Sequence, residues 1–301
     1  MSSAPILADI TVNGCAVKAV AVGGKQAFLY VFDRITGQPV WPIDERPVPQ
    51  TDVPGEKTSP TQPFPTKPPP YARNSLKVPD DLIDFTPELR AQAVKNLERY
   101  KVAPWMYNPP ILGTANGILG AINLGNAVGG TNWPGIAYDP ETHTIFAQAN
   151  NAGLTSTSLV EPPKGFSDIR YVSGVAGRPF QEVLGPGDCC AADSPRAQAQ
   201  AQAAAQPAPA AAPAPAGGGG EALFGRLAVD GLPLVKPPYG VLTAINLDRG
   251  DIVWQVPHGD TPDIVRNHPA LKGLTIPKTG QVPTGGVGSM VTKTLVVMGD
   301  P

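Results

Sequence analysis

The chain has 301 residues, of which 42% are hydrophobic and 16% are charged, and its formal net charge is -2. This length can bury a sizeable core and is compatible with a single domain. The nearly neutral balance gives no basic face for nucleic acid or an anionic membrane, so a small-molecule partner is expected instead. No apolar run reaches the roughly 18 residues of a transmembrane helix, so no membrane span is predicted.

The first residues predict an antiparallel hairpin. Strands are expected over Ala8–Val12 and Val17–Val22, because Asn13-Gly14 between them favours a type I′ turn. Lys25 follows the second strand, directly after two glycines. On the residues alone, a lone lysine in such a place indicates a solvated turn residue. Residues 1–10 lack the basic flank and the long apolar core of a signal peptide.

A spaced pattern of eleven positions occurs twice, over Val31–Trp41 and Ala244–Trp254. Both copies have Asp or Asn at the third position, Gly at the seventh and Trp at the eleventh. The acidic or amide side chain can hydrogen-bond the turn backbone, the glycine permits a tight reversal, and the tryptophan can dock between neighbouring sheets. Two copies with the same offsets favour a β-propeller over a sandwich.

This frame resembles the tryptophan-docking repeat of the pyrroloquinoline quinone (PQQ) dehydrogenases. Further similarity to the glucose-dehydrogenase branch of that family lies in LADITVNG (7–14), Lys25, VFDRITG (31–37), RPVP (46–49) and SPTQPF (59–64). The resemblance extends with gaps over most of the chain. It implies an all-β fold, an eight-bladed quinoprotein β-propeller of which this chain holds about four blades, central to late, with one inserted helix and a disordered insert.

The resemblance also implies an activity, which is PQQ-dependent oxidation of a sugar or alcohol, with glucose as the first expectation. A carboxylate would remove the hydroxyl proton, hydride would pass to the quinone, and electrons would leave to ubiquinone or another acceptor. Lys25 falls where the family places the lysine that reaches the quinone oxygens of PQQ. Its ammonium group would polarise the quinone and stabilise the negative charge that develops on it. The sequence contains no substrate contact that separates glucose from another polyol or alcohol.

Two segments before the middle of the chain are expected to be structural. The prolines of Val48–Tyr71 are too dense for a central strand, so an ordered surface loop packed against the propeller is predicted. A helix is predicted over residues 86–100, with Thr86 as the N-cap and Pro87 at the first helical position. Its apolar stripe consists of Leu89, Ala93, Leu97 and Tyr100.

A second blade hairpin is predicted from Ile136 to Gln148. Trp133 precedes it, and two interpretations are open: a core aromatic or, by resemblance, a residue near the cofactor. Asn150 falls where the family has an asparagine that lines the PQQ site. Asn151, the next residue, is the alternative match to that asparagine. Pro134 departs from the family pattern, in which a glycine is common, and this puts the local geometry in doubt.

Residues 191–220 are almost entirely Ala, Gln, Pro and Gly, so a disordered insert is predicted between propeller segments 1–190 and 221–301. Cys15 stands alone, whereas Cys189 and Cys190 are adjacent at the edge of the insert. Chance adjacency is favoured over the vicinal disulfide found in the alcohol-dehydrogenase branch. The three histidines have no metal-ligand spacing, and no C-x-x-C-H sequence for covalent haem occurs.

The chain stops within a predicted strand, Leu295–Pro301, so it is interpreted as a fragment that is inactive alone. By resemblance, the catalytic aspartate, most Ca²⁺ ligands and an export signal to the periplasm would precede it, and Asp9 is expected to be structural. The competing hypothesis is a non-catalytic propeller scaffold that uses the tryptophan repeats for assembly. A scaffold has no reason to keep Lys25, the SPTQPF loop and the Asn132-Trp133 segment together, and their co-occurrence favours the enzyme.

Overall fold

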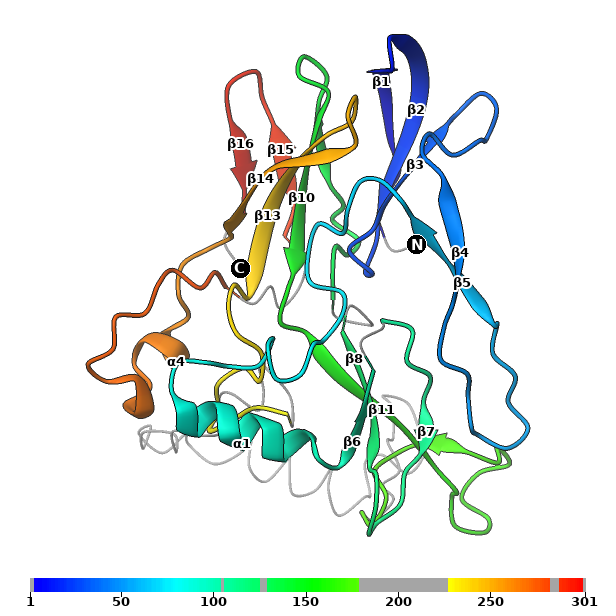
Figure 1. Ribbon diagram of the computed structural model, residues 1–301, viewed down its shortest axis with the longest axis vertical. Coiled ribbons are helices and arrows are strands. Elements are labelled where there is room, and N and C mark those ends of the chain that lie inside the picture. Colours follow the sequence, from blue (N-terminus) through cyan, green and yellow to red (C-terminus); the bar gives the residue numbers. More distant parts are fainter. Residues whose placement is uncertain (1–2, 104–105, 125–128, 179–226, 282–286, 300–301) are drawn as a thin grey trace, which may run out of the picture.

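The computed structural model describes residues 3–103, 106–124, 129–178, 227–281 and 287–299, and most of its elements are strands. Figure 1 shows two blade-like sheets and a hairpin in the upper half, with a further sheet and a helix below them. A helix with the length and apolarity needed to cross a membrane does not occur in these ranges. Cys189, Cys190 and the predicted insert 191–220 lie outside the described residues.

The first blade is an antiparallel sheet of β1 (Ile6–Val12), β2 (Cys15–Gly23) and β3 (Leu29–Asp33), in that order. A bridge from Phe32 to Pro39 continues the sheet toward Trp41. The predicted turn between β1 and β2 is confirmed, since Asn13 and Gly14 both have positive φ, 51° and 81°.

The second blade has the strand order β14-β13-β10-β9, all antiparallel. Its strands are β9 (Ala137–Asp139), β10 (Thr144–Asn150), β13 (Gly240–Asn246) and β14 (Asp251–Pro257). Although β10 and β13 are far apart in sequence, they are directly paired, with Asn150 opposite Gly240. The chain between them therefore leaves the blade and returns at the same place. A further hairpin, β15 (Ser289–Val291) and β16 (Val296–Met298), follows.

Both predicted repeats form the expected turns. Asp33 Oδ1 accepts hydrogen bonds from the Ile35 and Thr36 amides, at 2.7 and 3.2 Å. In the second copy, Asn246 Oδ1 accepts from the Asp248 and Arg249 amides, at 3.1 and 3.0 Å. The seventh residues, Gly37 and Gly250, have φ values of 75° and 67°. The glycine and the turn-bonding side chain thus act as the pattern predicts.

Trp41 docks between the blades. A Cβ added to Gly250 would lie 2.7 Å from Trp41 Cζ2, so the indole of the first repeat lies directly on the turn of the second. Trp254, the equivalent residue of the second repeat, packs against Phe146 with ring centroids 5.8 Å apart and is partly exposed.

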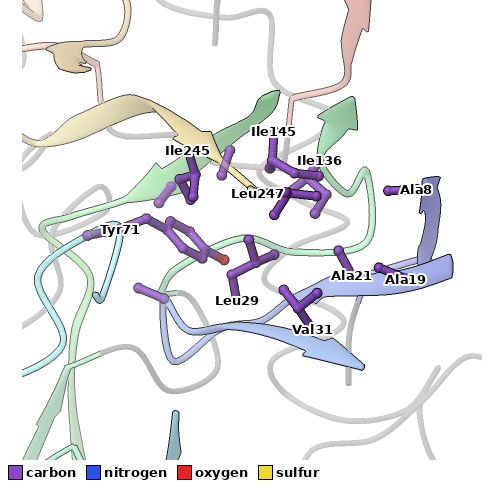
Figure 2. Close-up of a cluster of buried hydrophobic side chains, with 14 of the residues drawn as sticks. Ala8, Ala19, Ala21, Leu29, Val31, Tyr71, Ile136, Ile145, Ile245 and Leu247 are labelled. Atoms are coloured by element: carbon purple, nitrogen blue, oxygen red, sulfur yellow. The ribbon is translucent and has the colours of Figure 1, made fainter. Parts of the chain in front are cut away.

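The two blades also share a buried apolar core. Ala8, Ala19, Ala21, Leu29 and Val31 of the first blade meet Ile136, Ile145, Ile245 and Leu247 from the second blade and the loop before it (Figure 2). Tyr71, which belongs to neither blade, is completely buried in this cluster. Its ring lies between Leu29 and the strand that carries Ile245 (Figure 2). The prediction of a partial β-propeller is confirmed by this arrangement of sheets.

The proline-rich loop packs against the propeller, as predicted. Within it, β5 (Thr61–Pro65) pairs with β4 (Ile43–Pro47), which lies just before the loop. The Phe64 ring meets Phe28 of the first blade edge to face, with centroids 5.7 Å apart. The Arg46 guanidinium lies 5.2 Å from the centroid of the Phe64 ring.

Helix α1 (Pro87–Leu97) begins as predicted, because Thr86 accepts a hydrogen bond from the Leu89 amide and Pro87 starts the helix. Leu89, Ala93 and Leu97 are buried. The helix ends before residue 100, and Tyr100 instead begins β6. A short helix α4 (Asp263–Arg266) and a 3₁₀ turn (Pro269–Leu271) follow the second blade.

A further sheet, which was not predicted from the sequence, lies below the blades in Figure 1. Its strand order is β12-β11-β8-β6, and a short strand β7 pairs with β11. The strands are β6 (Tyr100–Val102), β7 (Ile111–Leu112), β8 (Gly120–Leu124), β11 (Leu154–Val160) and β12 (Val172–Ser173). The β6·β8 and β7·β11 pairs are parallel, which no tight hairpin produces. The strands β6, β7 and β8 of this sheet precede the β9–β10 hairpin in the chain, and β11 and β12 follow it.

Candidate functional site

Lys25 lies in the turn that joins β2 to β3. The Ala27 amide donates to the Gly24 carbonyl at 3.0 Å and closes this turn, in which Ala27 has φ of 58°. Lys25 is half-buried. The turn is thus held by its own backbone, and the side chain of Lys25 is not fully solvated as the simple turn interpretation requires.

The Gly130–Thr131 segment lies directly against this turn. The Thr131 amide donates to the Gly24 carbonyl at 3.2 Å. Gly130 has φ of 55°, and a Cβ on it would lie only 2.4 Å from the Lys25 carbonyl oxygen. A side chain at position 130 would therefore collide with backbone, and glycine is what allows the two segments to approach.

Asn150 is joined to the same place through Gly130. The Asn150 amide donates to the Gly130 carbonyl at 2.9 Å, and the Gly130 amide donates back to the Asn150 carbonyl at 3.2 Å. Asn150 is the last residue of β10 and is buried, with its Oδ1 accepting from the Ala152 and Gly153 amides. The structure thus brings Lys25 and Asn150, far apart in sequence, to opposite sides of one glycine.

Asn151 is the alternative to Asn150 as the family's site asparagine, and its side chain forms different hydrogen bonds. Its Oδ1 accepts from the Arg73 amide, and its Nδ2 donates to the Pro238 carbonyl at 2.7 Å. These bonds tie the proline-rich loop to the segment that enters β13. Asn150, which pairs with Gly130, stays the candidate for the site.

Trp133 lies on the surface, with 71% of its area exposed. The interpretation of Trp133 as a core aromatic is therefore wrong. It sits in a turn that the Gly135 amide closes by donating to the Asn132 carbonyl at 2.9 Å, with Pro134 accommodated inside it. The exposed indole stands three residues after Gly130, on the segment that contacts the Lys25 turn.

The Tyr71 hydroxyl lies at the centre of these contacts, although no sequence motif predicts a role for Tyr71 in the site. The hydroxyl accepts from the Gly24 amide at 3.1 Å. Its single proton is shared between two acceptors, the Gly24 carbonyl oxygen and Thr131 Oγ1, each 3.0 Å away. Burial raises the pKa of Tyr71 to about 12, so the hydroxyl stays protonated at neutral pH. A tyrosine after three prolines carries no sequence signal for such a role, because its partners are distant in the chain.

A separate cleft of about 660 Å³ opens at the same end of the second blade. It lies between the ends of β14 and β16 and is lined by Leu242, His258, Gly259, Asp260, Lys278, Val296, Met298 and Gly299. It contains none of the predicted site residues. His258 and His268 lie outside the strands and helices and are buried, and each ring contacts a backbone carbonyl.

The residues around Lys25 provide a cation, a buried amide and an exposed indole, and these groups suit an anionic planar ligand. The described ranges contain no group of three or more His, Cys, Asp or Glu side chains that could hold a metal. Asp9, which was expected to be structural, forms an ion pair with Arg34 at 2.7 Å.

A family model described as "Glucose/ethanol/alcohol dehydrogenase, beta-propeller domain", of the PQQ type, matches residues 1–300. Among curated proteins, the chain is 27% identical over 260 residues to the quinate/shikimate dehydrogenase (quinone) of Acinetobacter baylyi, covering 86% of this chain and 28% of that relative. It is 28% identical over 266 residues to the quinoprotein glucose dehydrogenase of Escherichia coli, with coverage of 86% and 28%. It is 27% identical over 262 residues to the glycerol dehydrogenase large subunit of Gluconobacter oxydans, with coverage of 82% and 30%. The chain thus spans less than a third of the length of these relatives.

Proposed function

Because this chain belongs to the glucose/ethanol/alcohol dehydrogenase family with a PQQ-type β-propeller domain, we propose that its Lys25 turn forms part of a PQQ site in a sugar or alcohol dehydrogenase. The observation that carries the proposal is the meeting of the Lys25 turn, Gly130 and Asn150. These segments belong to two blades and are joined by backbone hydrogen bonds. Such a rigid junction suits a cofactor that must be held in one orientation.

The residues present fit PQQ. When bound, PQQ supplies an ortho-quinone that accepts two electrons. The ammonium group of Lys25 would bind its oxygens and stabilise the negative charge that develops on them, an effect that is stronger in a half-buried place than in water. Asn150 would line the site, and Trp133 offers an exposed aromatic face beside it. Gly130 allows the backbone of its segment to pack directly against the Lys25 turn, because a Cβ there would lie 2.4 Å from the Lys25 carbonyl oxygen.

Calcium is part of the same proposal, but the described residues supply no cluster of ligands for it. In this proposal its ligands and the catalytic aspartate are not assigned to any described residue of this chain. Within this chain, the chemistry assigned to named residues is limited to binding and orienting the cofactor and stabilising its charge.

Glucose is the first substrate to test. The segments 7–14, 46–49 and 59–64 resemble the glucose-dehydrogenase branch. The curated relatives act, by their names, on quinate or shikimate, glucose and glycerol. All four compounds are polyhydroxylated, so the substrate class proposed here is a polyol or sugar. Ubiquinone or another quinone is the proposed acceptor, and the periplasm is the proposed location.

Replacing Lys25 by alanine in the full-length gene product tests the proposal. We expect Lys25→Ala to weaken PQQ binding by about tenfold or more, because a charge-assisted contact is lost. Fluorescence titration measures the binding. The circular dichroism spectrum should be unchanged. Lys18→Ala is the matched control, because Lys18 is an exposed lysine of β2, the strand that leads into the Lys25 turn. PQQ affinity that is equal in the two variants would remove Lys25 from the site.

A further inference from the structure

We infer that Tyr71 is a positioning residue that fixes the Lys25 turn, and through it Lys25, relative to the Gly130–Thr131 segment. The inference rests on the cofactor role proposed for Lys25. It concerns a side chain that lies outside both blades and acts through backbone groups on each side of it.

The Tyr71 hydroxyl is bonded to both polar backbone groups of Gly24, the residue next to Lys25. Gly24 N–H donates to Tyr71 Oη at 3.1 Å, and Oη lies 3.0 Å from the Gly24 carbonyl oxygen. On its other side, Oη lies 3.0 Å from Thr131 Oγ1, which itself donates to the Gln148 carbonyl. One hydroxyl therefore joins the turn of the first blade to the Gly130–Thr131 segment and, through it, to β10 of the second.

Tyr71 is itself held from two directions. Its amide donates to the Ala27 carbonyl at 3.0 Å, within the same turn that contains Lys25. Its carbonyl accepts from Thr243 Oγ1 and Gln255 Nε2, both at 2.8 Å, which belong to β13 and β14. The ring fills the core between the blades (Figure 2). Tyr71 therefore transmits the position of the second blade to the Lys25 turn.

Removing only the hydroxyl would deprive the buried Gly24 N–H of its acceptor. An unpaired buried amide is costly, so the turn is expected to shift to find another partner. The ring of phenylalanine would still fill the core, so the fold should persist. The expected consequence is a displaced Lys25, with a smaller loss of cofactor binding than removal of the lysine itself.

The experiment compares Tyr71→Phe with Tyr138→Phe in the full-length gene product. Tyr138 is a good control because its hydroxyl also bridges the two blades, donating to the Asp9 carbonyl at 3.1 Å, but away from the Lys25 turn. We expect Tyr71→Phe to weaken PQQ binding by about threefold to tenfold, and Tyr138→Phe to leave it unchanged. Equal PQQ affinities for both variants and the native protein would overturn the inference.

A double-mutant cycle with Lys25→Ala tests whether Tyr71 acts through Lys25. If it does, adding Tyr71→Phe to Lys25→Ala should cause no further loss of PQQ affinity, because the group that was positioned is already gone. Losses that add fully would show that Tyr71 does not act through the lysine, and would overturn the inference.

Hydrogen exchange at Gly24 gives a readout that does not depend on the cofactor. We expect the Gly24 amide to exchange faster in Tyr71→Phe and at the native rate in Tyr138→Phe. If Lys25→Ala binds PQQ normally, the proposed cofactor contact is wrong, and the exchange rate then decides separately whether Tyr71 holds the turn. An unchanged rate in Tyr71→Phe would show that it does not.

Discussion

Gly250 is the residue at which the second repeat meets the first blade. Its φ of 67° is in the left-handed region, so it makes the turn between β13 and β14 possible. The Trp41 indole also lies where a Cβ of residue 250 would be, at 2.7 Å. The same glycine therefore serves its own turn and provides the surface on which the tryptophan of the preceding repeat rests.

Gly250→Ala should destabilise the protein by about 2 to 4 kcal/mol, since it adds backbone strain and overpacks the indole. Gly14→Ala is the matched control, because Gly14 has φ of 81° but no heavy atom within 4 Å of its added Cβ. We expect only about 1 kcal/mol there. Urea unfolding of both variants measures the difference, and equal losses would show that the Trp41 contact adds nothing.

The site residues show which parts of a site a sequence can predict. Lys25 and Asn150 were predicted by resemblance, and the structure joins their segments through Gly130. The role of Tyr71 was not predictable, because its hydroxyl bonds to Gly24 and Thr131 across distant parts of the chain. Local propensities contain no information on which distant backbone groups a buried hydroxyl will meet. The cofactor role of Lys25, Asn150 and Trp133 stays a prediction.

At the scale of elements, strong local sequence signals correctly predicted the turns and the helix start that they mark. The Asn13-Gly14 hairpin, both repeat turns and the start of α1 form as their residues predict. The sheet that contains β8 and β11 was missed. β8 is buried throughout and shows no alternation, and two of the pairings in this sheet are parallel. Such strands carry weak local signals, since their pairing depends on contacts between distant segments.

Helix α1 provides a test of a local interaction. Thr86→Ala removes the acceptor of the Leu89 amide, whose bond to Thr86 Oγ1 measures 3.2 Å, and should weaken the helix by about 1 kcal/mol. Hydrogen exchange of the Leu89 amide should become faster. Thr86→Ser keeps the hydroxyl and should exchange at close to the native rate. Equal protection in the alanine and serine variants would show that the cap does not contribute.

At the scale of the whole molecule, the blades are joined at both ends and through the core between them. Tyr71 and Gly130 link them near Lys25. At the opposite end, Asp248 of the second blade accepts from the Thr11 amide of the first at 2.7 Å, and its Oδ1 lies 2.8 Å from His143 Nδ1. Asp248 belongs to the same turn as Gly250, so this one turn makes both the Thr11 contact and the Trp41 contact.

Asp248→Ala should lower the free energy of unfolding by about 1 kcal/mol, because it removes charge-assisted bonds to two segments that are partly exposed. Asp251→Ala is the control in the same hairpin. Its ion pair with Arg249 is exposed, so its loss should change stability by less than about 0.5 kcal/mol. The two variants can be compared by thermal unfolding. If they are equally stable, Asp248 does not hold the blades together.

The direct pairing of Asn150 with Gly240 has a consequence for how such a protein can change over evolution. The two strands are adjacent in the sheet, so the chain that connects residue 150 to residue 240 takes the place that a hairpin loop would have. Lengthening a loop costs little free energy, since closure entropy grows only slowly with length. The pairing of β10 with β13 therefore does not depend on the length of this connection, although β11 within the connection also pairs with β8. Length changes in the connection outside β11 can thus be accepted without a change in the register of the second blade.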